Sequence, residues 1–348
     1  MAKTAFATGN ALTKKAWEEK LFRDWPKGSF FGIGLMGKPG NKNSFIHVED
    51  EWEKNKGDRV TFGICMRLSG TGVVEGVTLE GAEEALTTYS FNLTLTELAH
   101  GVRDRGPIDR QRPAFSIDTE SEAALKEWGG EKIDEKIFEA LRTSPTAIFY
   151  NTNATAGSTT MAWSATAATA KAALRGTLTL DMLSWIATWA KTGNNRAQTP
   201  LKPAKIDGKD YYALVVHPDC LYDLKATTAY QTAMREAQVR GASNPLFTNA
   251  NAVWHNVIVY EHENCSIGTD GGAGAQAWAH CHFLGAQAIA WGWGKRPVVE
   301  YETFDYKREH GYGMSMIYAV GKPKFNSKDY GALSLYLART QISDSTAA

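Results

Sequence analysis

The segment from residue 58 to residue 95 constrains the fold of this chain most, because its pattern predicts one long β-hairpin. The first limb, residues 59–68, alternates apolar and mostly polar side chains, which is the period of a half-buried strand. The sequence SGTG at residues 69–72 favours a turn, and a strand-like second limb follows over residues 77–95. A limb of about nine residues spans about 30 Å. An exposed hairpin of that length invites pairing with another chain, so we expect it to serve assembly.

The charge balance argues against a dedicated nucleic-acid-binding protein. Lys and Arg together number 38, as do Asp and Glu, so the formal net charge is zero. Residues 1–40 form a basic stretch, which suits a solvated arm as well as a weak contact with DNA. A length of 348 residues with 43% hydrophobic residues is ordinary for a globular protein of about two domains.

The cysteines and the apolar runs indicate the cellular compartment. The four cysteines form no CxxC pair, which favours reduced thiols in a cytosol over a disulfide framework. The chain opens with no signal-peptide pattern and contains no run of about eighteen apolar residues. We therefore expect a soluble protein, made in the cytoplasm, with no membrane contact.

Two helices stand out in the middle of the chain, after an arm at residues 1–55 with a short helix at 14–22. Residues 119–142 predict the longer one, with Thr119 and Glu122 spaced as a capping box. Gly129 and Gly130 lie within it and cost about 2 kcal/mol relative to two alanines, enough to split it. The second helix is expected at residues 180–191.

Irregular segments and strands fill the rest. Residues 144–177, rich in Thr, Ala and Ser, predict a loop with little to pack, and residues 268–272 predict a flexible segment. Beyond Pro200 and Pro203 the pattern becomes mixed α/β. Helices are expected after Pro218 and around residues 230–237, and strands at residues 211–216, 257–260, 277–290, 298–304, 314–320 and 331–337.

A glycine pattern at residues 32–37 matches G-x-G-x-x-G, which in a dinucleotide-binding fold joins a strand to a helix. Pro39 and Gly40 argue against the helix, and Pro26 and Gly28 leave little room for the strand. We therefore interpret it as a glycine loop in an arm, with a nucleotide site as the alternative.

Three further patterns have a chemical and a structural interpretation. His280 and His282 share one face of a predicted strand and would need His262 or Cys265 to complete a zinc site. His217 and Cys220 would need a third group to act as a nucleophilic pair, and the Trp-Gly-Trp of residues 291–293 suits buried anchors as well as base stacking. The structural interpretation is favoured throughout, so no catalytic, cofactor-binding or metal-binding residue is expected.

Five segments together resemble a known family. They are residues 57–62 (GDRVTF), 79–87 (LEGAEEALT), 207–211 (DGKDY) with His217-Pro218, 243–247 (SNPLF) and 325–331 (FNSKDYG). With the order of arm, hairpin, long helix and mixed α/β region, the chain resembles a major capsid protein of a tailed bacteriophage with the Hong Kong 97 fold, in the podophage-type coat protein branch.

The resemblance implies an α+β fold with named parts. Residues 1–55 would be the N-terminal arm, 56–95 the extended loop, 96–203 the peripheral domain with its spine helix, 204–296 the axial domain, and 297–348 the return strands and C-terminal tail. Hexamers and pentamers would build an icosahedral shell around double-stranded DNA. The implied partners are the chain itself, a portal, DNA held by weak non-specific contact, and a scaffold or decoration protein. Assembly in the host cytoplasm and residence in the virion capsid follow.

Two departures limit what carries over. Some relatives cross-link through a lysine of the extended loop, but residues 57–95 contain none. The arm is also too short for a fused scaffolding segment, so a separate scaffold protein or none is expected. A cargo shell of the encapsulin type, with the same fold, and a nucleotide-binding enzyme remain as alternatives.

Charge along the chain predicts how neighbouring copies meet. The returning limb carries glutamates without a base between them, and the loop at residues 101–113 carries a net positive charge. We expect the hairpin to lie over a neighbouring copy, with these charges setting register. The expected contact residues are Arg59, Val60, Phe62, Ile64, Met66, Arg67, Leu68, Glu75, Glu80, Glu83, Glu84, Arg103, Arg105, Arg110 and Arg112.

Overall fold

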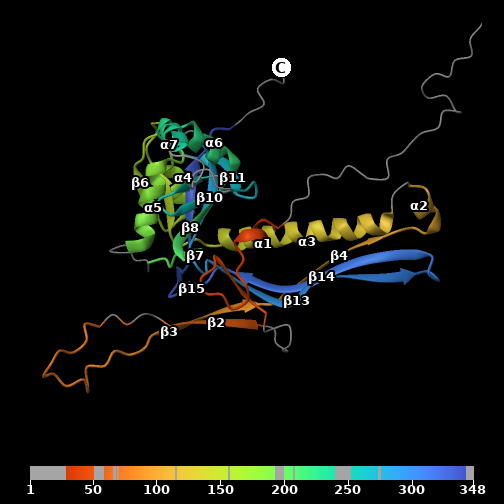
Figure 1. Cartoon of the computed structure of the whole chain (residues 1–348), viewed down its shortest axis with the longest axis horizontal. Helices are drawn as coiled ribbons and strands as arrows, with labels where there is room; N and C mark the ends of the chain where they lie inside the picture. The colour runs from red at the N-terminus through yellow and green to blue at the C-terminus, as the bar shows by residue number, and fades with distance from the viewer. Residues whose placement is uncertain are drawn as a thin grey trace, which may run out of the picture.

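The structure is a computed structural model, and it describes residues 29–50, 59–65, 68, 70–113, 116–155, 157–192, 200–206, 208–239, 252–272 and 276–341. Figure 1 shows a compact lobe at one end and a long helix, α3 (Ile117–Arg142), that runs out of it beside a sheet. A hairpin leaves the base of this sheet and points away from the free end of α3. The arm helix predicted at residues 14–22 lies outside the described residues.

A mixed sheet forms the centre of the compact lobe, and the described residues contribute nine strands to it. Its path is β6 (Met161–Ser164), β5 (Ile148–Asn151), β17 (Ala332–Ala338), β12 (Gln276–Leu284), β8 (Lys209–Val216), β10 (Val257–Glu261) and β9 (Ala252–Trp254), with β11 (Ser266–Gly271) on β12 and β7 (Ala204–Ile206) on β8. The lobe helices are α4 (Ala167–Ala173), α5 (Leu180–Thr192), α6 (Pro218–Ala226) and α7 (Thr228–Val239). The helices predicted at and beyond residue 180 are thus confirmed in position, as are the predicted strands at residues 211–216, 257–260, 298–304, 314–320 and 331–337. The predicted strand at residues 277–290 is instead two strands, because β12 ends at Leu284 and the next strand begins only at Ile289 after a turn.

Two predictions for this lobe were wrong. Residues 144–177 are not a loop with little to pack, because they contain β5, β6 and α4, and Phe149 of β5 is fully buried against Trp189. Residues 268–272 largely belong to β11, where Gly268 lies directly under the Trp278 ring. The lobe core joins α5 to β8 and β12, so packing continues across the predicted domain boundary at residues 203–204.

A second sheet lies along α3, in the order β1 (Ile46–Glu49), β13 (Ile289–Phe304), β14 (Glu309–Gly321) and β4 (Thr96–Arg103). The apolar side of α3, including Ile137 and Phe138, packs on its β13–β14 ladder. Gly129 does not break the helix. A Cβ there would lie 2.4 Å from Cε of Met314, so the missing side chain lets α3 approach β14 closely.

The start of α3 is fixed by a side chain that the capping-box prediction missed. Ser116 is the N-cap, and its Oγ accepts a hydrogen bond from the Thr119 backbone N–H, so Thr119 is not the cap. Further along, Asp134 is buried and accepts hydrogen bonds from the backbone N–H groups of Phe30 and Phe31 at 2.6 and 3.2 Å. This carboxylate therefore pins the short helix α1 (Phe30–Gly34) to α3.

The glycine pattern at residues 32–37 does not join a strand to a helix. Gly32 and Gly34 lie inside α1, and Gly37 follows it in close contact with Ser44. A dinucleotide-binding loop places its glycines ahead of the helix that receives the phosphates. The fold therefore does not support the nucleotide-site alternative, and the predicted glycine loop is wrong in one respect, because two of its three glycines lie in a short helix.

The hairpin is shorter than its alternation predicts. Strands β2 (Arg59–Cys65) and β3 (Thr88–Thr94) pair from Arg59 opposite Thr94 to Cys65 opposite Thr88. Residues 69–72 are therefore not the turn, and no strand occurs in the described residues 70–87. The small ladder of β15 (Lys324–Phe325) and β16 (Lys328–Asp329) lies beside β3. No helix in the described parts of the chain has the length and apolar character to span a membrane.

Candidate assembly surfaces

The base of the hairpin is held by its own chain. Leu93, with Phe62 and Phe91 around it, packs against Ala290 and Ala319 of the second sheet. Part of the predicted apolar face is thus covered within the subunit, which corrects the expectation that only a neighbour buries it. Beside this contact Ile64 lines a cavity of about 310 Å³ between the hairpin and the body. Arg59 is exposed, whereas Met66, Arg67 and the side chain of Val60 lie outside what the structure describes.

The loop beyond the hairpin strands is the most exposed apolar segment of the described chain. Its large apolar residues have no cover: exposed fractions are 58% for Leu68, 76% for Val74, 57% for Val77, 59% for Leu79 and 62% for Leu86. Apolar residues gathered on one exposed segment mark an interaction surface. We call residues 68–87 the hairpin loop.

The four predicted glutamates are all exposed on this loop. Glu83 accepts a hydrogen bond from the Gly81 N–H at 2.7 Å, and Glu84 accepts one from the Gly70 N–H at 2.6 Å. These two carboxylates therefore also shape the loop. Glu75 and Glu80 make no such bond to the described residues, so their charges face solvent.

The four predicted arginines gather at the far end of α3, but they are not equally available. Arg103 pairs with Glu309 at 2.6 Å, Arg110 with Asp104 at 3.0 Å, and Arg112 with Asp109 at 3.3 Å. Arg105 is exposed and forms no ion pair with the described residues. We call residues 103–112 together with 304–310 the distal end.

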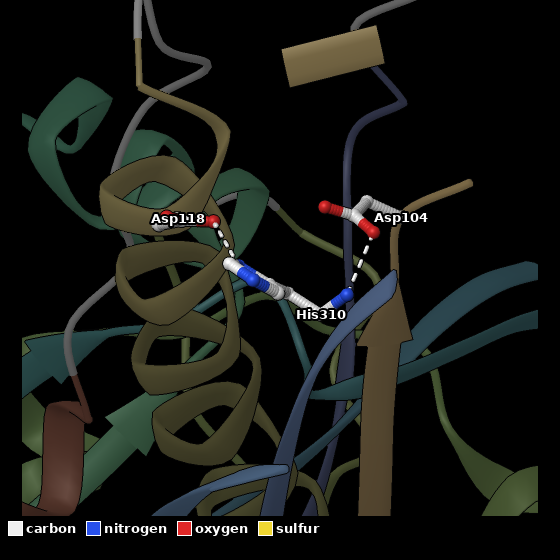
Figure 2. A group of neighbouring side chains, drawn as sticks. All are labelled: Asp104, Asp118 and His310. Carbon is white, nitrogen blue, oxygen red and sulfur yellow. Dashed lines mark hydrogen bonds and ion pairs between the residues drawn. The ribbon is translucent and has the colours of Figure 1, made fainter. Parts of the chain in front are cut away.

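A polar cluster that the sequence did not reveal holds the distal end together. Figure 2 shows His310 of β14 between Asp104, which follows β4, and Asp118 of α3. The backbone N–H of His310 donates to Asp104 Oδ1 at 2.7 Å, and the ring Nδ1 of His310 lies 3.8 Å from Asp118 Oδ1. Burial, with the neighbouring Asp118 carboxylate, raises the pKa of Tyr312 to about 12. Three elements far apart in sequence are thereby tied at one point.

The same cluster is the one place in the described residues where three ligand-type side chains converge. Asp104, Asp118 and His310 each offer one ligand atom, all within 4.8 Å of one another. However, the Arg110 guanidinium already pairs with Asp104 and donates to the Arg308 carbonyl at 2.8 Å. Because this cation supplies the positive charge, we interpret the cluster as a structural tie.

The predicted zinc candidates lie in the core of the lobe instead. His280 stacks on Tyr336 with ring centroids 4.7 Å apart, and its Nε2 lies 2.9 Å from Ser334 Oγ. Burial lowers the pKa of His280 to about 3 and that of His282 well below its ordinary value. Within the described residues neither histidine belongs to a group of three ligands.

The remaining candidate patterns also serve packing. Cys220 is fully buried in α6, and its contact with Cys281 together with burial raises its pKa, whereas His217 Nδ1 accepts from the Asp219 N–H at 3.2 Å. Trp291 is buried and stacks on Tyr318 with centroids 5.2 Å apart. Asp134 was missed, although an acidic residue beside Ile133 and Ile137 on an apolar helix face was a usable signal.

Comparison with known proteins identifies the family. A family model described as phage capsid protein matches residues 5–337. The major capsid protein of Pseudomonas phage KPP25 is 25% identical, over 96% of this chain and 97% of that protein. Among solved structures, the capsid of Ralstonia phage GP4 superposes with a TM-score of 0.79 at 24% identity, covering 98% of this chain and 100% of that one. The cyanophage Pam1 capsid gives 0.78 at 23%, with the same coverage.

These likenesses extend over nearly the whole chain and include both the lobe and the extended part. The mixed helix-and-sheet architecture expected from the Hong Kong 97 resemblance is confirmed by them. The chain belongs to the phage capsid protein family, as a major capsid protein and a structural component of the virus shell.

Proposed function

We propose that this major capsid protein assembles as hexamers and pentamers into an icosahedral shell that encloses double-stranded DNA. The contact that carries the assembly joins the hairpin loop of one copy to the distal end of the next. The observation behind this is their placement: the hairpin loop and the distal end lie at opposite ends of the molecule (Figure 1). They cannot meet within one chain, so a contact between them is head-to-tail between copies, the kind that closes into rings.

Charge favours the same pairing. The described loop residues 70–87 carry four carboxylates and no cation, whereas exposed arginines gather at the distal end. Opposite charges at an interface steer encounter and set register. Repeated over a shell, such contacts are multivalent, so each one is weak on its own.

The ion pairs at the distal end refine which charges matter. Arg103 and Arg110 are occupied by Glu309 and Asp104 within the subunit. Arg105 forms no ion pair with the described residues, and Arg112 pairs with Asp109 but keeps a side chain that is 73% exposed, so these two cations can reach a neighbour. We infer that these two meet the loop glutamates, while Arg103 and Arg110 keep the distal end rigid.

We infer the further partners from the resemblance to tailed-phage capsid proteins. We expect a portal, a separate scaffold or decoration protein, and DNA held weakly, since the chain has no net charge. Residues 57–95 contain no lysine for a covalent cross-link. The loop contact is therefore a non-covalent lock. The subunit is assembled in the host cytoplasm and ends in the virion. A shell that encloses cargo protein is the alternative, and the nucleic acid content of purified particles distinguishes the two.

Reversing two loop charges tests the contact. Glu75→Lys with Glu80→Lys reverses the charge at two positions whose carboxylates make no bond to the described residues, so the loop itself is left intact. Shell formation, followed by light scattering against protein concentration, should then require at least tenfold more protein. The control is Asp210→Lys with Glu261→Lys, which makes the same charge change on exposed residues of the lobe.

The control should assemble as the unaltered chain does. Equal assembly of both variants would contradict the loop contact. An unaltered chain that stays monomeric in light scattering at all concentrations would contradict the shell itself.

A further inference from the structure

The turn that joins β13 to β14 has an unusual backbone. Asp305, Tyr306 and Lys307 have φ angles of 48°, 52° and 67°, all in the left-handed region. Side chains other than those of Gly and Asn are disfavoured there, because Cβ crowds the following carbonyl. Elsewhere in the described residues positive φ at non-glycine positions occurs singly or in pairs, so this run of three stands apart.

Tyr306, in the middle of the run, is fully exposed. Aromatic side chains are normally well covered in a folded subunit, and tyrosine is among the residues that dominate the energy of interfaces. Tyr306 combines an unfavourable backbone conformation with a fully exposed aromatic ring, and such an outlier points to a functional role.

The turn is rigidly supported, which a passive loop tip does not need. The Arg308 N–H donates to the Phe304 and Asp305 carbonyls at 3.1 and 3.0 Å. Arg110 holds the Arg308 carbonyl at 2.8 Å, and the Asp104–Asp118–His310 cluster lies two residues further along β14 (Figure 2). The ring is thus presented from a fixed position.

The surroundings of Tyr306 resemble the centre and rim of an interface. Ile108 of the adjacent helix α2 (Pro107–Gln111) is 63% exposed. Exposed cations accompany these two apolar residues on the same end: Arg105, Arg112, Lys307 and Arg308. An apolar centre with a charged rim is the usual anatomy of a protein–protein contact.

We propose that Tyr306 is the anchor of the contact between copies: its ring seats among Val77, Leu79 and Leu86 on the hairpin loop of a second subunit. The loop supplies partners for both parts of this end: exposed aliphatic side chains for the apolar centre and four carboxylates for the basic rim. The proposal rests on the shell function proposed above and names the residue on which the head-to-tail contact depends. The left-handed turn serves to aim the ring outward.

Replacing the strained anchor separates folding from assembly. Tyr306→Gly relieves the left-handed backbone and removes the ring, whereas Tyr306→Phe keeps the ring and the strain. The unassembled Tyr306→Gly subunit, kept dilute, should unfold about 1–3 °C higher than the unaltered chain. Its threshold concentration for shell formation should rise about tenfold or more. Tyr306→Phe should match the unaltered chain in both measurements.

A disulfide cross-link tests which residues of the hairpin loop contact Tyr306. Tyr306→Cys on one copy is mixed with Val77→Cys, Leu79→Cys or Leu86→Cys on another, all carrying Cys65→Ser, because Cys65 is the exposed cysteine. Diamide then oxidises the two thiols to a disulfide, which forms only if their Cα atoms approach to about 7 Å or less. At least one loop variant should give a cross-linked dimer, and Tyr222→Cys on the exposed face of α6 should give none.

The outcomes distinguish this proposal from the shell function. Shells that form from Tyr306→Gly at the unaltered threshold overturn the anchor and leave the shell function standing. A Tyr306→Cys chain that cross-links only to another Tyr306→Cys chain contradicts the proposed contact between Tyr306 and the hairpin loop. Loss of assembly in the unaltered chain overturns the shell function.

Discussion

At the scale of single residues, buried polar groups set the pH range in which the subunit is stable. His280 and His282 are both buried in the lobe core, where desolvation favours their neutral forms. An unfolded histidine has a pKa of about 6.5, so below that pH the unfolded chain binds more protons than the folded one. Stability is therefore full above about pH 6.5 and falls as the pH drops from there toward 3.

Replacing these histidines should flatten that dependence. In the unaltered chain, His280 should reduce the unfolding free energy by about 2 kcal/mol between pH 7 and pH 5, because a pKa difference is worth about 1.4 kcal/mol per unit. Urea unfolding of the dilute subunit at both pH values measures the loss. His280→Gln should lose about 2 kcal/mol less over this interval than the unaltered chain. The exposed His255→Gln should behave as the unaltered chain, and an equal loss in all three would contradict the assignment.

At the scale of elements, prediction succeeded where a segment's own pattern matched its environment. The buried strand β8 and helix α5 have enough residues for their periods to be read, and both lie where expected. Four-residue strands such as β5 are too short for a period, so residues 144–177 read as a loop. Gly268 suggested flexibility, but its missing side chain makes room for the Trp278 ring of the neighbouring strand.

Glycines at which two backbone segments approach closely can be tested at this scale. A Cβ on Gly331 would lie 2.8 Å from the Ala286 carbonyl oxygen and from backbone atoms of Ala288, where the Gly285 N–H donates to the Gly331 carbonyl. Gly331→Ala should therefore lower the unfolding free energy by about 1–3 kcal/mol, since backbone cannot yield as a side chain does. Gly313→Ala, with open space at the Cβ, is the control, and urea unfolding of both variants measures the difference. Equal stability of the two would contradict the crossing as the reason for Gly331.

At the scale of the whole molecule, the hairpin loop and the distal end carry opposite charges and lie too far apart to meet in one chain (Figure 1). Their attraction therefore acts between copies. Because these surfaces are solvent-exposed, salt should screen their attraction: the Debye length falls from about 10 Å at 0.1 M to about 3 Å at 1 M. Shell formation in light scattering should weaken as NaCl rises over that range, while the thermal midpoint of the dilute subunit changes little. Assembly that strengthens steadily with salt would show that apolar burial, not charge, dominates the contact.

The sequence by itself determined the family, the long helix, the strands with a readable period, and the acidic and basic segments, because each depends on residues that are close in the chain. Only the tertiary structure decided which of those charges are free. Arg110 is engaged by Asp104, and the His310 backbone by the same carboxylate, through contacts between residues up to about two hundred positions apart. The tertiary structure also decided that the base of the hairpin is buried within the subunit and that Tyr306 is exposed. Burial depends on how distant segments pack and not on the local sequence pattern.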